Sequence, residues 1–185
     1  MLTTGTAGNA MSFTAADGGK TKGTTFGLSG DAGGVAFFPG TKFAFVVQAP
    51  TQLTGLLGGY NVIDASMPGS PKVTDENRVQ NDMRISYPVT SVKGRKSVVY
   101  PSTDKGKLNL LEMGLEGGKA KLMQTIVVGD ASTLAYGLCA GDDGLVLVAN
   151  EKEHYVGVVD LNTGKTFQVP WEVDKTGPND IKLIP

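Results

Sequence analysis

The chain has 185 residues, of which 40% are apolar, and a formal net charge of −1. This length suits one domain with a real hydrophobic core, and the near-neutral charge argues against a nucleic-acid binder or a polybasic membrane-surface protein. No apolar run approaches the roughly 20 residues of a membrane span. The single cysteine excludes an intrachain disulfide, and the 26 glycines predict many tight turns between short strands.

In chain order, residues 1–29 are predicted to form the outer strands of an incomplete sheet. Within this segment, residues 10–28 contain two strand-like runs around a turn at residues 17–20 (DGGK). A small sheet of this kind cannot bury both of its faces alone, so it must pack against a neighbouring unit.

Three complete units follow, at residues 30–79, 80–129 and 130–174. Each unit contains four short runs that are rich in branched and aromatic residues and bounded by turn residues, which is typical of β-strands. The runs lie at 34–38, 42–47, 61–66 and 72–79 in the first unit, at 84–87, 97–100, 109–113 and 120–128 in the second, and at 134–138, 145–148, 157–161 and 166–169 in the third.

A repeated marker fixes the length of the unit. Asp64, Glu112 and Asp160 each follow an apolar run and recur every 48 residues, and each precedes a turn that leads to a lysine. Four-stranded units of about 40–50 residues are the signature of β-propeller blades, which stack side by side around an axis.

Residues 175–185 are expected to form the first, innermost strand of a next blade. The predicted fold class is therefore all-β: a β-propeller of about four four-stranded blades of about 47 residues, forming an incomplete ring that is part of a larger one. Exposed sheet edges promote association. We therefore expect a piece of a longer propeller, or a chain that pairs with another.

Two segments carry a family resemblance. Residues 60–72 (YNVIDASMPGSPK) resemble the LVIVD-type propeller repeat, and residues 144–165 resemble the YVTN-type repeat, in which a strand ending in Asn precedes a Val-Ile-Asp-x-x-Thr-Gly-Lys pattern. Residues 177–181 (GPNDI) are similar to the start of the following blade in the same group. The resemblance is poor for residues 80–128.

This resemblance implies surface or secreted propellers, or lactonase-like enzymes. It favours an extracellular, cell-surface or periplasmic location over a cytoplasmic one. It implies no particular catalytic residue, because the motifs specify a blade and no reaction.

Four aspartates are the candidate metal ligands, and each comes just before an inferred innermost strand. In a propeller these connections surround the mouth of the central channel, so the four carboxylates could bind a divalent cation such as Ca²⁺ or activate an ester or lactone through it. Aspartate after Gly or Asn is also a common turn residue that bonds its own backbone, and this alternative stays open. The four are Asp31, Asp82, Asp130 and Asp180.

Two further polar loops are considered. His154, the only histidine, follows Glu151 and Glu153; it is either a solvated loop residue or a general base oriented by one of these glutamates. Residues 93–96 (KGRK) are predicted to form a solvated turn, since four residues make no groove for a nucleic acid.

Three functions fit these observations. The first is a binding or scaffold module for a protein partner or for a small-molecule ligand at the channel mouth. The second is a lactonase- or cyclase-like hydrolase with a metal held by the acidic loops. The third is a subunit or fragment of a larger propeller assembly, whose remaining blades are the partners. The residues do not decide whether the chain is an enzyme.

Overall fold

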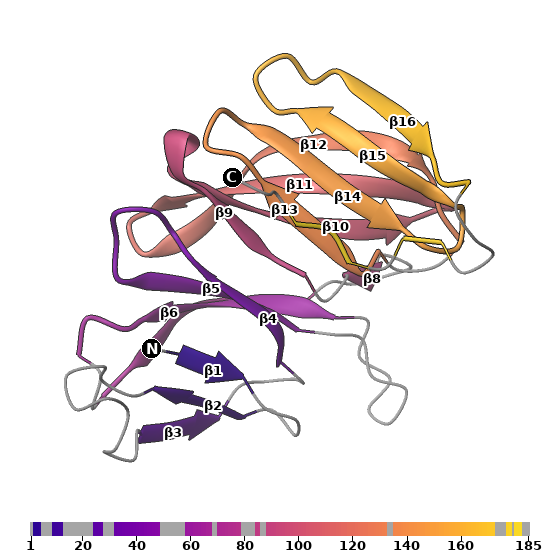
Figure 1. The fold of residues 1–185 in the computed structure, drawn as a ribbon. Helices are drawn as coiled ribbons and strands as arrows, with labels where there is room; N and C mark the ends of the chain where they lie inside the picture. Colours follow the sequence, from indigo (N-terminus) through magenta and orange to yellow (C-terminus); the bar gives the residue numbers. More distant parts are fainter. Residues whose placement is uncertain are drawn as a thin grey trace.

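Among the residues that it describes, the computed structural model has four antiparallel β-sheets and one short 3-10 helix, η1 (Lys93–Arg95) (Figure 1). In the part of the chain that the structure describes, no helix is long and apolar enough to cross a membrane. The described residues are 2–4, 9–12, 24–27, 32–48, 58–67, 70–78, 84–85, 88–132, 135–172, 177–178 and 180–182.

The first sheet has three strands, in the order β1-β2-β3. They are β1 (Leu2–Thr4), β2 (Asn9–Ser12) and β3 (Thr24–Gly27). The runs within residues 10–28 predict two strands, so the structure adds β1, a short run that pairs with β2.

The second sheet has four strands, in the order β4-β5-β6-β7. They are β4 (Ala32–Phe37), β5 (Phe43–Gln48), β6 (Gly59–Asp64) and β7 (Lys72–Arg78). The turn after β6 is capped locally, because Oδ1 of Asp64 accepts a hydrogen bond of 2.9 Å from the backbone N–H of Ser66.

The third sheet has a broken innermost strand. It runs in the order β12-β11-β10-β8, and β9 also pairs with β10. Pro88 lies between β8 and β9, and proline has no N–H to donate to a strand ladder, which explains the interruption. The strands are β8 (Arg84–Ile85), β9 (Thr90–Val92), β10 (Ser97–Asp104), β11 (Lys107–Glu116) and β12 (Lys119–Asp130).

The fourth sheet has four strands, in the order β13-β14-β15-β16. They are β13 (Gly137–Ala140), β14 (Leu145–Asn150), β15 (Tyr155–Asp160) and β16 (Thr166–Pro170). Beyond it, the described residues 177–178 and 180–182 are not paired as a strand. Their backbone passes beside β13, where a Cβ on Gly137 would lie 3.1 Å from Cα of Asp180.

The sheets are stacked through their innermost strands and their faces. β1 contacts β4, β4 contacts β9, and β9 contacts β13, so the four sheets follow one another around a common axis. One hydrophobic core lies between the second and third sheets and includes the rings of Phe45 and Tyr100, whose centroids are 5.4 Å apart. A second core joins the third and fourth sheets and includes Leu110, Val128 and Val146. This is blade stacking in an unclosed ring.

Candidate functional site

The described part of the candidate site is the rim where β12 leads into the fourth sheet. Asp130 ends β12, Asn150 ends β14, and Tyr155 begins β15. The backbone carbonyl of Asp130 accepts hydrogen bonds from Nδ2 of Asn150 at 3.2 Å and from the hydroxyl of Tyr155 at 2.9 Å. The fourth sheet therefore fixes the end of the third sheet at this rim.

The carboxylate of Asp130 lies on the outside of this contact. Its Oδ1 is 2.5 Å from Nζ of Lys107, the residue that begins β11. Both side chains are mostly exposed, so this ion pair contributes little to stability.

A second set of hydrogen bonds connects the turn after β14 with the loop that follows β12. Oε1 of Glu153 accepts hydrogen bonds from the backbone N–H of Ser132 at 3.0 Å and from its hydroxyl at 2.6 Å. The backbone N–H of Glu153 donates to Oδ1 of Asn150 at 3.3 Å. Glu153 thus supports the loop geometry.

His154 lies in the same turn, with an exposed side chain and a left-handed backbone at φ 52°. Its N–H donates to the carbonyl of Glu151, and its own carbonyl accepts from the N–H of Trp171 at 2.8 Å. These contacts belong to the backbone. A general base requires an orienting partner, and Oε1 of Glu153, one of the two candidate glutamates, accepts its hydrogen bonds from Ser132. A general-base role for His154 stays a prediction.

Asp180 lies beside the innermost strand of the fourth sheet. Its Oδ1 accepts the N–H of Ile181 at 2.9 Å, and its Oδ2 is 3.5 Å from Nζ of Lys182. The segment approaches the rim closely at Gly177, which has a φ of 69° and where a Cβ would collide with the carbonyl of Glu151. Glycine is therefore required where this segment crosses the rim.

The predicted ring of four carboxylates is only half described. Asp31 and Asp82 lie outside the described residues. Asp130 and Asp180 each have a local partner, as described above. Within the described residues, no three His, Cys, Asp or Glu side chains gather where a metal ion could be held. The Ca²⁺ site stays a prediction.

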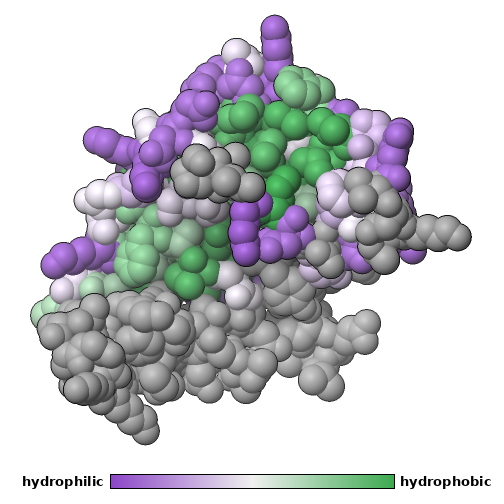
Figure 2. All heavy atoms as spheres, in the orientation of Figure 1, coloured by the Kyte–Doolittle hydropathy of each residue, from purple (hydrophilic) through white to green (hydrophobic). Residues whose placement is uncertain are grey.

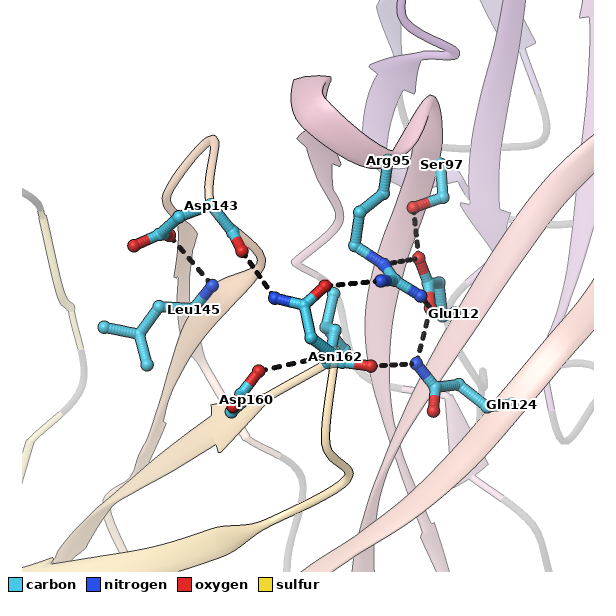
Figure 3. A network of polar contacts seen from close by, with 9 residues as sticks. Arg95, Ser97, Glu112, Gln124, Asp143, Leu145, Asp160 and Asn162 are labelled. Carbon is cyan, nitrogen blue, oxygen red and sulfur yellow. Dashed lines mark hydrogen bonds and ion pairs between the residues drawn. The ribbon is translucent and has the colours of Figure 1, made fainter.

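A polar network that the sequence did not suggest lies between the third and fourth sheets (Figure 3). Glu112 of β11 is fully buried, and each of its carboxylate oxygens accepts two hydrogen bonds. Oε1 accepts from Nε of Arg95 at 2.7 Å and from the hydroxyl of Ser97 at 2.5 Å. Oε2 accepts from Nη2 of Arg95 at 3.0 Å and from Nε2 of Gln124 at 2.6 Å.

The same donors reach across to the fourth sheet. Nη1 of Arg95 donates to Oδ1 of Asn162 at 2.7 Å, and Nε2 of Gln124 donates to the carbonyl of Leu161 at 2.9 Å. Nδ2 of Asn162 in turn donates to the carbonyl of Asp143 at 2.8 Å (Figure 3). The network therefore fastens the turn after β15 to the third sheet.

The hydrogen bonds of this network stabilise the negative charge of Glu112 and the positive charge of Arg95. Burial by itself would raise the pKa of the Glu112 carboxyl, but the hydrogen bonds from Arg95 and the two other donors outweigh burial and lower that pKa. The hydrogen bond with the same carboxylate raises the pKa of Arg95. With all four acceptor positions used, Glu112 is a structural anchor.

The comparisons with known proteins address the fold. No protein-family model matches the sequence, and no curated protein matches it. Among solved structures, dihydro-heme d1 dehydrogenase NirN in complex with DHE matches with a TM-score of 0.62 and 14% identity, over 89% of this chain and 33% of that chain. A chain of the nidogen/laminin complex matches over 97% of this chain and 95% of its own, with 8% identity and a TM-score of 0.31, too low to carry an argument.

The chain is a β-propeller arc. It spans about a third of the length of the NirN chain, and at 14% identity this likeness concerns the fold alone. The predicted all-β propeller with about four blades in an incomplete ring is confirmed.

Two details of the predicted turns differ in the propeller. Arg95, which the sequence places in a solvated turn, is half-buried and bonded to Glu112. Of the three repeat markers, Asp64 and Asp160 cap exposed turns, whereas Glu112 is buried between sheets. The sequence signal for this difference is that the second unit has a glutamate where the other two have the shorter aspartate.

Proposed function

We propose that the chain is a non-catalytic binding or scaffold module, in which the loops at the rim of the propeller engage a protein partner or a small-molecule ligand. The observation that carries this proposal is that hydrogen bonds hold the loops of the rim in place. The backbone carbonyl of Asp130 accepts hydrogen bonds from Asn150 and Tyr155, and the carboxylate of Glu153 accepts one from Ser132. Loops fixed in advance lose less conformational entropy on binding, which suits a recognition surface.

We also propose that the second sheet belongs to the LVIVD type of repeat and the fourth sheet to the YVTN type. In support, Asp64 and Asp160 form the same contact after the third strand of their sheets. Each accepts a hydrogen bond through Oδ1 from the backbone N–H two residues on, at 2.9 Å to Ser66 and 2.8 Å to Asn162. An extracellular, cell-surface or periplasmic location belongs to this proposal, and fractionation of cells that produce the protein tests it.

The hydrolase alternative is tested with metal and substrate. The purified chain is titrated with Ca²⁺ by calorimetry and assayed with γ-butyrolactone and an aryl ester, with and without Ca²⁺. We expect no stoichiometric binding and no turnover. One Ca²⁺ per chain with Ca²⁺-dependent lactone hydrolysis would overturn the proposal. That activity should then be lost in Asp130→Asn and Asp180→Asn and kept in Asp142→Asn, an exposed turn residue at the opposite end of β14.

Binding at the rim is tested with a second pair of variants. Proteins captured from extracts by the immobilised chain are compared with those captured by His154→Glu at the rim and by Asp142→Lys at the opposite end. We expect one or more captured proteins to be lost with His154→Glu alone. Capture that is equally strong with both variants would place recognition elsewhere.

A further inference from the structure

The fourth sheet is packed on one face only. In the third sheet, all residues from Ser97 to Thr103 in β10 and from Leu108 to Met113 in β11 are buried, so both faces of these middle strands are covered. In β15, buried and half-exposed residues alternate along the whole strand. Because side chains alternate between faces with a period of two, one face of the fourth sheet has no covering layer among the described residues.

Strand register identifies the residues of the two faces. On the packed face, Val146 pairs with Val159, and both are fully buried against the third sheet. On the opposite face, Leu147 pairs with Val158, and Val158 pairs with Phe167 of β16. We call this second surface the open face; its exposed and half-exposed apolar residues on β14, β15 and β16 are Leu145, Leu147, Val156, Val158, Phe167 and Val169.

The open face has the composition of a buried surface. A sheet with one solvated face alternates apolar and polar residues, whereas β14 begins with four consecutive apolar residues, Leu145 to Val148. Phe167 is 60% exposed, and Figure 2 shows a continuous hydrophobic area over the fourth sheet. The charged residue at its edge, Asp160, is bonded to the N–H of Asn162 and to the hydroxyl of Thr163.

The opposite end of the arc is covered. The face of the second sheet that points away from the third is buried too: Ala44, Val46 and Ile63 have no exposed area. The first sheet lies at this end, with β1 against β4 (Figure 1). One end of the arc is therefore formed by the first sheet, and the other end by an apolar face without a covering sheet among the described residues.

We propose that a second copy of the chain covers the open face, so that two arcs complete one ring. The first sheet of each copy packs on the open face of the other, which gives two identical contacts related by a two-fold axis. Each chain contributes four sheets, so that two copies contribute eight, within the about 4–8 blades of closed propellers.

Two observations favour a second copy as the occupant. The first sheet has three strands where the second and fourth have four. The backbone of Asp180 and Ile181 lies beside Gly137 at the inner edge of the open face, where the missing innermost strand of a covering sheet would lie. A formal charge of −1 also gives two copies little mutual repulsion.

The test is the mass of the full chain in solution, measured by sedimentation velocity over a concentration series. We expect a species of twice 19.3 kDa. Val158→Glu should weaken dimerisation by about a hundredfold or more, because it buries an unpaired charge in the contact. Val127→Glu is the matched control, since Val127 is 55% exposed on β12, outside the open face, and it should leave dimerisation unchanged.

Phe167→Glu provides a second variant at the most exposed position of the open face, in case Val158→Glu does not fold, and circular dichroism verifies the fold of each. A chain that stays monomeric at every concentration would overturn the proposal. A dimer unaffected by both variants, or oligomers that grow beyond two copies, would overturn it as well.

Discussion

The third and fourth sheets share a pattern of consecutive apolar residues in their middle strands, but these strands have different surroundings. Both contain middle strands with consecutive apolar residues, such as Val98 to Tyr100 in β10 and Leu145 to Val148 in β14. In the third sheet these strands are buried on both faces, and in the fourth on one. An apolar run without alternation is therefore typical of a strand that is buried on both faces. The fourth sheet has this composition, but the described residues of one chain cover only one of its faces.

The largest effect is expected where the two sheets are fastened together. Arg95→Met leaves the buried Glu112 carboxylate without its cation, which should cost about 3–5 kcal/mol of unfolding free energy. Urea unfolding followed by circular dichroism measures this loss. The double variant Arg95→Met with Glu112→Leu should recover much of the stability, because the unpaired charge is gone. A single variant as stable as the parent would show that the ion pair does not form.

The two sheets can be compared directly with one type of substitution. Leu110→Ala in β11 empties a fully buried position and should cost about 2–5 kcal/mol. Leu147→Ala on the half-buried open face should cost only about 1 kcal/mol, because less apolar area is lost. Both are measured by urea unfolding at the lowest practical protein concentration, where a single arc predominates. Equal costs would contradict the difference in burial.

The junction between the sheets also contains a close approach. A Cβ on Gly157 would collide with Cγ1 of Val128 on β12, so Gly157→Ala should cost about 1–3 kcal/mol through overpacking. Adding Val128→Ala makes room, and the double variant should be more stable than the sum of the single effects implies. Thermal unfolding of the four proteins measures this coupling. Strict additivity would mean that the two residues are not in contact.

The smallest effect is expected from pH. The folded state lowers the pKa of Glu112, so its contribution to stability is present above the ordinary glutamate value of about 4.3 and is lost as the pH falls through the lower, folded value. Glu112→Gln should therefore show a shallower loss of stability with acid than the parent. Urea midpoints between neutral pH and pH about 3 measure the slopes, and identical slopes would assign the acid sensitivity to other carboxylates.

The strands and their stacking could be predicted from local patterns. Runs 97–100 and 109–113 lie within β10 and β11, because short apolar runs between turns are a local property of the chain. Pro88 gives a local signal for the break between β8 and β9 as well, since proline has no N–H to donate to a strand ladder.

The inter-sheet network could not be predicted in the same way. The contact between Arg95 and Glu112 joins a turn to a strand across 17 residues, and its extension to Asn162 crosses to another sheet. Such contacts depend on how sheets stack, which spacing alone does not specify. The carboxylate ring stays a prediction for a different reason, because Asp31 and Asp82 lie outside the described residues.

The most direct test of the blade stacking is a nuclear Overhauser spectrum of the chain with labelled valine, glycine and aromatic residues. The stacking places a methyl group of Val128 next to the α-protons of Gly157, and the ring of Phe45 next to that of Tyr100. We expect cross-peaks for both pairs, each joining two different sheets. A spectrum in which the strands pair as described but neither cross-peak appears would contradict the propeller arrangement.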